Sequence, residues 1–94
     1  GAMSVRWLVV EDAFADARGV VLEPRIVIER PIRGEVEVTL RSPDGRERVA
    51  RASMTVSHVR GPLAPFVMIR LYGVNLEDVP AGTEIWGPRE AESA

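Results

Sequence analysis

The chain has 94 residues, of which 46% are hydrophobic and 28% are charged, and this is enough for one globular domain. Its formal net charge of −2 gives no overall attraction to nucleic acid, and no apolar run of about 18 residues is present that could cross a membrane. The chain has no cysteine, so we expect a protein of the reducing cytoplasm. The first three residues, Gly-Ala-Met, are typical of a cleaved expression tag. We therefore expect a disordered start over residues 1–4, one domain over 5–88 and a frayed polar tail over 89–94.

Two segments rich in β-branched residues open the chain. Residues 5–14 and 19–30 contain repeated Val and Ile, which favour strands. Pro24 interrupts the second segment, and because proline cannot donate a backbone hydrogen bond, it marks an edge, a bulge or a break.

A hairpin with a two-residue period follows. Apolar and polar residues alternate strictly over 34–42, which predicts a half-buried strand. The Pro-Asp-Gly sequence at 43–45 predicts a turn, with glycine at a positive φ. The return strand over 46–59 places Ala50, Met54 and His58 on one face, so a buried histidine on the core side is the simplest interpretation.

The next strand, over 65–73, is apolar on both faces. Val67, Ile69 and Leu71 alternate with a second set that contains Phe66, Met68 and Tyr72. Aromatic residues and methionine are enriched in the cores of protein interfaces, so these three residues are the candidate partner-binding surface. The alternative is that the chain itself covers them, with Trp7 or Trp86.

The segment after Gly73 predicts a corner. Asn75 and Asp78 suit the ends of one short helical turn near 75–79, and Pro80 prevents its continuation. Gly82 suits a left-handed turn into a last strand over 83–86. The chain is therefore expected to be all-β, with about six strands and short connections, which favours a small closed barrel.

Three segments carry a resemblance to a known family. "VVEDAF" (9–14), "RGVVLEPRI" (18–26) and "IRLYGVNLEDVPAGTEI" (69–85) resemble, in order and spacing, the second domain of the translation-factor GTPases, the β-barrel that follows the GTPase domain in elongation factor Tu. The resemblance implies a six-stranded barrel that docks against a neighbouring domain or handles tRNA ends.

The same resemblance implies an RNA-binding alternative. In elongation factor Tu the opening positions of this barrel line the pocket for the aminoacyl end of tRNA, and here they correspond to Glu11, Asp12 and Phe14. This sequence departs from the family at Glu23-Pro24, where Thr-Gly is usual, and at Phe66, where a polar residue is usual. These departures argue against the same ligand bound in the same way.

The charge pattern gives a second argument for RNA. Residues 41–60 hold five arginines against two acids, between two acidic ends. On a twisted hairpin this could form a basic ribbon that meets phosphates, although a mixed, solvated face is the simpler interpretation, and no aromatic stacking residue lies among them. The candidate residues are Arg46, Arg48, Arg51 and Arg60.

Catalysis and cofactors have little support in the sequence. With no lysine, no phosphate-binding G-x-x-x-x-G-K-[ST] loop is possible, so the chain is not a GTPase and we expect no nucleotide cofactor. The single histidine, His58, cannot supply a structural metal site, and its neighbour Ser57 faces the other way on a strand. We expect a non-enzymatic module that binds a protein partner or an adjacent domain, with RNA or aminoacyl-tRNA as the alternative.

Overall fold

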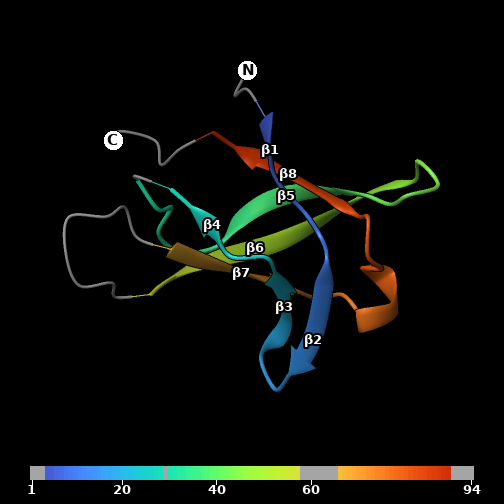
Figure 1. Ribbon diagram of the computed structural model, residues 1–94, viewed down its shortest axis with the longest axis horizontal. Helices are drawn as coiled ribbons and strands as arrows, with labels where there is room; N and C mark the ends of the chain where they lie inside the picture. Colours follow the sequence, from blue (N-terminus) through green and yellow to red (C-terminus); the bar gives the residue numbers. More distant parts are fainter. Residues whose placement is uncertain (1–3, 29, 58–65, 90–94) are drawn as a thin grey trace.

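The computed structural model describes residues 4–28, 30–57 and 66–89, and these form an all-β unit. Its antiparallel strands follow one another in the order β1-β8-β5-β6-β7-β3-β2, and the short strand β4 pairs with β7 (Figure 1). The strands are β1 (Ser4–Val9), β2 (Asp12–Asp16), β3 (Gly19–Glu23), β4 (Ile26–Val27), β5 (Val36–Arg41), β6 (Glu47–Ser57), β7 (Phe66–Tyr72) and β8 (Glu84–Pro88).

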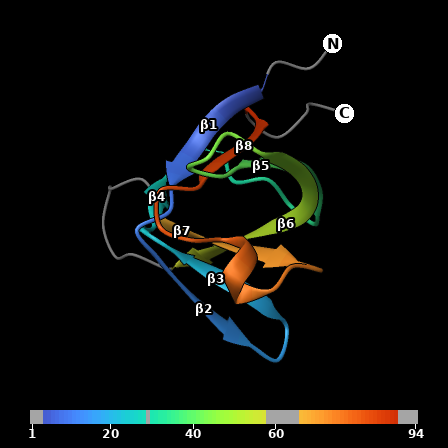
Figure 2. The ribbon, with the colours of Figure 1, turned by 90° about the vertical axis from the view of Figure 1, so that its right-hand side faces the viewer.

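The hydrophobic core lies against the inward faces of the central strands. On β5 it takes Val38 and Leu40, each no more than 2% exposed, and these are the apolar positions of the alternating pattern. On β7 the inward set is wholly buried, as the sequence predicted. The sheet curls, so that β1 and β8 lie on one side of the molecule and β2 and β3 on the other (Figure 2).

The expected six-stranded closed barrel is wrong in strand number and in closure. The sheet has eight strands, and its two ends, β1 and β2, do not pair with each other. The segment expected as one strand over 5–14 divides because its neighbours differ: Val10 N–H donates to the Thr83 carbonyl at 2.8 Å, whereas Glu11 N–H donates to the Glu23 carbonyl at 2.8 Å. Consecutive residues therefore leave one end of the sheet and enter the other.

The second expected strand, over 19–30, also divides. It ends as β3 at Glu23, immediately before Pro24, and resumes as the two-residue strand β4. This break agrees with the missing hydrogen-bond donor of proline. The start of the domain differs as well, because β1 begins at Ser4, a residue assigned from the sequence to the disordered start.

The corner after β7 agrees closely with the sequence. A single 3₁₀ turn, η1, spans Leu76–Asp78, and the Asp78 carboxylate accepts a hydrogen bond of 2.8 Å from the Asn75 N–H. The carboxylate thereby satisfies a backbone donor at the start of the turn. Gly82 has a φ of +94°, which confirms the left-handed turn.

Trp7 fixes the β1–β8 side of the core. It lies at the irregularity in the β1–β8 register, between Arg6 and Leu8, and is 9% exposed. Its Nε1 donates to the Pro88 carbonyl at 2.9 Å, so the buried indole keeps its hydrogen bond. Its ring packs against Gly87. A Cβ atom at position 87 would lie 2.5 Å from the nearest atom of the Trp7 ring, so only glycine fits there.

Candidate docking surface

The outward side of β7 contains the residues that the sequence analysis chose for partner binding. Val67, Ile69 and Leu71 point into the core, and Phe66 and Met68 therefore point away from it. The Phe66 side chain is 39% exposed and Met68 is half-buried. The two-sided apolar pattern thus has one side in the core and one side toward solvent.

The pairing register extends this outward side across three neighbouring strands. Phe66 is opposite Val27 of β4, which is 58% exposed, and residues opposite each other in an antiparallel pair share a face. Arg70 is opposite Val21 of β3, which is in turn opposite Phe14 of β2, 46% exposed. We call this surface the β2–β7 face; its members are Phe14, Val27, Phe66, Met68, Arg70 and Tyr72, and Val21, which stands between Phe14 and Arg70 in the register, is only 1% exposed.

An ion pair lies in the middle of the β2–β7 face. Nη1 of Arg70 is 2.5 Å from Oδ1 of Asp16, and the Arg70 side chain is 13% exposed. The same carboxylate accepts hydrogen bonds from the N–H groups of Arg18 at 2.9 Å and Gly19 at 3.1 Å. The hydrogen bond from Arg70 is the main reason that the pKa of Asp16 falls to about 2. This contact ties the β2–β3 hairpin to β7.

Tyr72 lies beyond this ion pair, apart from Phe66 and Met68. Its hydroxyl is 2.7 Å from Oγ of Ser53 on β6, and its ring is half-buried. A tyrosine with a satisfied hydroxyl is held in place by its own chain. The three residues chosen from the sequence therefore share one face but do not form one continuous apolar patch.

The opening residues of β2 are only partly as expected. Asp12 and Phe14 alternate on the strand and so share the outward side. Adjacent residues of one strand face opposite ways, so the sequence alone predicts that one of Glu11 and Asp12 faces into the barrel; this is wrong because both are exposed. Glu11 lies in the break between β1 and β2, where the strict alternation of a single strand does not apply.

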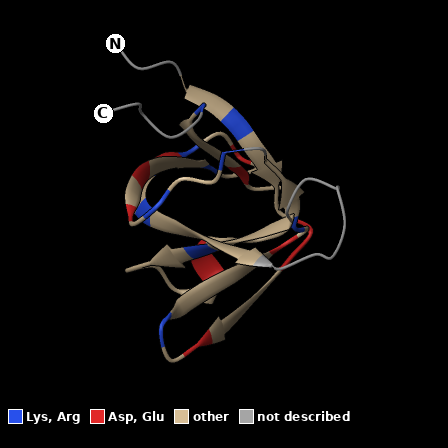
Figure 3. Cartoon of the chain, turned by 90° about the vertical axis from the view of Figure 1, so that its left-hand side faces the viewer, with Lys and Arg blue, Asp and Glu red and all other residues tan. Residues whose placement is uncertain are grey.

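The candidate arginines are interleaved with carboxylates. Arg48 lies 3.1 Å from Asp78, and Arg51 lies 3.4 Å from Glu35. Arg46, whose side chain is 87% exposed, lies 3.4 Å from Asp44 in its own turn. Figure 3 shows short blue and red segments scattered over a mostly uncharged ribbon. The described part of this arginine-rich region is thus a surface of mixed charge, which was the simpler interpretation of the sequence; Arg60 and His58 lie outside the described residues.

A polar cleft of about 370 Å³ separates the β5–β6 turn from η1. The ion pair between Arg48 and Asp78 joins its two walls. Since both arginines that line the cleft have carboxylate partners, an anion would have to compete with those partners. The lining residues are Leu40, Ser42, Asp44, Arg46, Glu47, Arg48, Glu77, Asp78 and Pro80.

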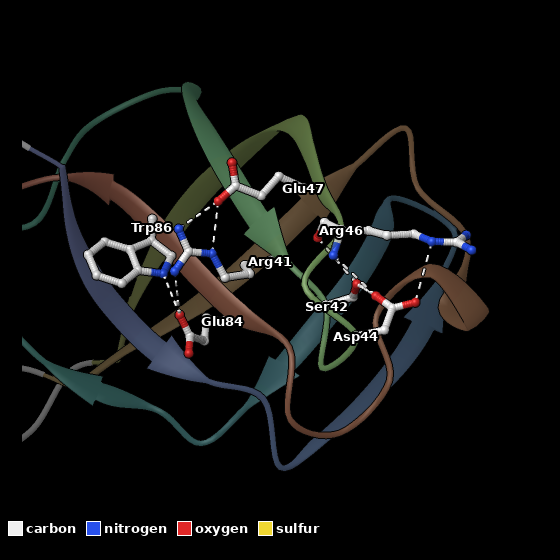
Figure 4. A network of polar contacts seen from close by, with 7 residues as sticks. All are labelled: Arg41, Ser42, Asp44, Arg46, Glu47, Glu84 and Trp86. Atoms are coloured by element: carbon white, nitrogen blue, oxygen red, sulfur yellow. Dashed lines mark hydrogen bonds and ion pairs between the residues drawn. The ribbon is translucent and has the colours of Figure 1, made fainter.

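The turn beside this cleft is held by one carboxylate. Asp44 accepts hydrogen bonds from the Ser42 hydroxyl and from the Arg46 N–H, the latter at 3.2 Å (Figure 4). These donors, the hydroxyl first, hold the pKa of Asp44 below its usual value. The interactions are local to the turn, and they account for the aspartate in the Pro-Asp-Gly sequence.

The outward side of β8 carries the second tryptophan, Trp86. The Arg41 guanidinium lies 5.6 Å from the centre of its ring, and Trp86 Nε1 donates to Glu84 at 2.8 Å (Figure 4). Arg41 is itself held by Glu47 at 2.6 Å, and the hydrogen bond between them raises the pKa of Arg41. Trp7 is in the core and Trp86 is on β8, so neither covers the β2–β7 face.

Within residues 4–28, 30–57 and 66–89, no group of three or more His, Asp and Glu side chains could hold a metal ion. In the same residues no helix is long and apolar enough to span a membrane. Sequence reasoning missed Val27 and the Asp16–Arg70 contact; the Ile-Val-Ile run after Pro24 was the available signal for the first.

Comparisons with protein-family models, with curated proteins and with solved structures gave no significant match.

Proposed function

We propose that this chain is a non-enzymatic binding module that docks onto a protein partner, or onto a neighbouring domain of a longer chain, through the β2–β7 face. The observation that carries the proposal is the exposure of Phe14, Val27 and Phe66 on one outward side of the sheet. Aromatic residues are enriched in the cores of protein interfaces, and exposed apolar patches mark interaction sites.

The dimensions of this face support the proposal. In the register Phe14 is level with Arg70, and Phe66 lies four residues further along β7, which is about 13 Å. Met68 lies between these levels and offers an adaptable side chain. The face thus has two aromatic anchors with a flexible apolar residue between them.

Affinity capture from source-cell lysate tests the proposal. The wild-type chain and the variants Phe14→Ser and Phe66→Ser are immobilised separately, and Val49→Ser serves as the matched control because Val49 is 58% exposed on β6, opposite Thr39 of β5 and outside the set that defines the face. Truncation of an interface anchor typically weakens binding about tenfold or more. We expect both face variants to lose a partner that the control retains, with unchanged circular dichroism and thermal midpoint. Equal capture by all four chains would show that the β2–β7 face is not the docking surface.

RNA or aminoacyl-tRNA binding is the alternative function, and the same experiment separates it. Half of each lysate is treated with RNase before capture. Docking onto protein predicts equal recovery from both halves. Recovery only from the untreated half, with steep salt dependence and loss on Arg48→Ala, would instead favour RNA binding through Glu11, Phe14 and the arginines.

A relation to the second domain of translation-factor GTPases is part of this proposal. It is supported by the order and spacing of the three sequence segments and by the all-β character of the chain. It implies a neighbouring domain as one class of partner. No ligand or residue role is carried over from it beyond the alternative above.

A further inference from the structure

We propose that β2 is an acceptor edge for strand addition, and that its partner is an extended segment in which one Lys or Arg stands two residues before an apolar residue and another stands two residues after it. The inference names the partner segment for the proposed docking function and so rests on that function. It is carried by the position of β2 in the sheet, by the order of its side chains and by the charge around it.

The position of β2 leaves one backbone edge without a strand. Among the described strands, β2 pairs with β3 alone and stands at the end of the sheet. In an antiparallel pair every second residue points its N–H and C=O away from the partner, so an end strand offers unpaired donors and acceptors. The turn η1 lies near β2, but four of the five residues of β2 are exposed. The edge is therefore open to an added strand.

One backbone N–H of β2 has a local hydrogen bond that an added strand could replace. The Ala13 N–H donates a 2.9 Å hydrogen bond to Oδ1 of the adjacent Asp12. This bond is short-range and exposed, so a carbonyl of an incoming strand can replace the carboxylate as acceptor. The carboxylate is then released to meet a basic side chain of the same ligand.

The side chains on the outward side of β2 define the ligand pattern. Asp12, Phe14 and Asp16 occupy alternate positions and share the β2–β7 face. Opposite charges and apolar pairs directly across from each other stabilise a strand pair. The sequence Asp-Ala-Phe-Ala-Asp reads the same in both directions, so a basic–apolar–basic segment fits parallel or antiparallel.

The surrounding charge favours a basic ligand, most strongly at the Asp12 end. Asp12 is opposite Glu23 of β3, and the adjacent Glu11 is exposed, so three carboxylates gather there. Asp16 is partly neutralised by Arg70. The charge also disfavours a second copy of this chain, because two β2 strands paired antiparallel about Phe14 would place Asp12 opposite Asp16 of the other copy.

The test uses a blocked heptapeptide, Thr-Lys-Thr-Val-Thr-Lys-Thr, added to the ¹⁵N-labelled chain up to about 2 mM, which reaches weak affinities. We expect amide shift changes centred on residues 12–16 and slower hydrogen exchange there. Two peptides serve as controls: one has Glu in place of both Lys, and the other keeps the charges but is N-methylated at both Thr next to Val. Both should bind at least about fivefold more weakly, because each lacks one of the two kinds of contact.

Variants of the chain sharpen the same test. Asp12→Lys should lower the affinity for the Lys peptide and raise the affinity for the Glu peptide. Glu37→Lys, the same charge change on an exposed residue of β5, should leave the ratio of the two affinities unchanged. Because Asp12 and Glu37 are both exposed, both variants should keep the wild-type spectrum away from the substituted residue.

In the peptide experiments, three results would overturn the inference: no shifts at residues 12–16, equal binding of the N-methylated peptide, or self-association of the chain with the same shifts and no peptide binding. Such a failure is distinguishable from failure of the proposed function. Capture of a partner that depends on Phe66 but not on Asp12 would refute strand addition and leave docking intact. Equal capture by the wild-type chain, Phe14→Ser, Phe66→Ser and the control Val49→Ser refutes docking through the face, whatever the peptides do.

Discussion

The aromatic residues on the β8 side of the sheet and those on the β2–β7 face have different surroundings. On the β8 side, Trp86 has the Arg41 guanidinium 5.6 Å from its ring centre and a hydrogen bond to Glu84. On the β2–β7 face, Phe14 and Phe66 are 46% and 39% exposed, and each lies opposite a valine, Val21 and Val27 respectively. We proposed the second side as the docking surface because, among the described residues, Phe14 and Phe66 remain exposed, whereas Trp86 is contacted by Arg41 and Glu84.

The largest effect concerns the core that both sides share. Leu71 is wholly buried beneath the β2–β7 face, so Leu71→Ala should lower the free energy of unfolding by about 2–5 kcal/mol. Val49→Ala, a truncation of a residue that is 58% exposed, should change it by about 0.5 kcal/mol or less. Urea denaturation measures both. Similar losses for the two variants would mean that β7 is not a core strand.

The next effect concerns the ion pair that holds the hairpin to β7. The folded-state pKa of Asp16 is lowered from 3.8 to about 2, first by the hydrogen bond from Arg70 and then by the Arg18 N–H. A lowered pKa contributes stability above about pH 4 that is lost as the pH falls toward 2. Asp16→Asn should therefore be less stable than the wild type at neutral pH, with a difference that shrinks between about pH 4 and pH 2.

Urea denaturation across that pH range tests this prediction, with Asp12→Asn as the control for the same charge change on the same strand. A difference between wild type and Asp16→Asn that stays constant over the range would show that the carboxylate does not carry the effect. The β2–β7 face would then be held by packing alone.

The smallest effect concerns Arg41, which lies over Trp86 on the β8 side of the sheet. Arg41 is about half exposed, and exposed ion pairs contribute little because water and salt screen them. Arg41→Gln should leave the thermal midpoint within experimental error, and it should also leave partner capture unchanged. A marked loss of capture in this variant would move the docking surface to the β8 side and reverse the comparison.

The regular parts of the fold could be predicted because they depend on local patterns. The two-residue period identified β5 and its inward residues, and the Pro-Asp-Gly sequence identified the turn with Gly45 at a φ of +89°. The corner residues Asn75, Asp78 and Gly82 also act through near neighbours. Such features need no knowledge of the rest of the chain.

The path of the sheet could not be predicted in the same way. The break after Val10 depends on the carbonyls of Thr83 and Glu23, which come from distant parts of the sequence. The residue order over 5–14 gives no sign that Val10 and Glu11 bond to different strands. The expected barrel was wrong for this reason.

The candidate surface was only half predictable. The sequence identified Phe66 and Met68 from the composition of one strand, but the contact of Arg70 with Asp16 joins residues that are 54 positions apart. Phe14 was chosen through a family resemblance, and the register then brings it to the same face as Phe66. Which residues share this face depends on how the strands pair, and strand pairing could not be predicted from the single sequence.

Radical footprinting of the chain, free and with its captured partner, tests the central claim most directly. It compares oxidation of Phe14, Phe66 and Met68 with that of Trp86, which is half-buried like Met68 but lies on the β8 side. The account predicts that the partner lowers oxidation at the first three residues and leaves Trp86 unchanged. Protection of Trp86 with no change at Phe14, Phe66 and Met68 would contradict it.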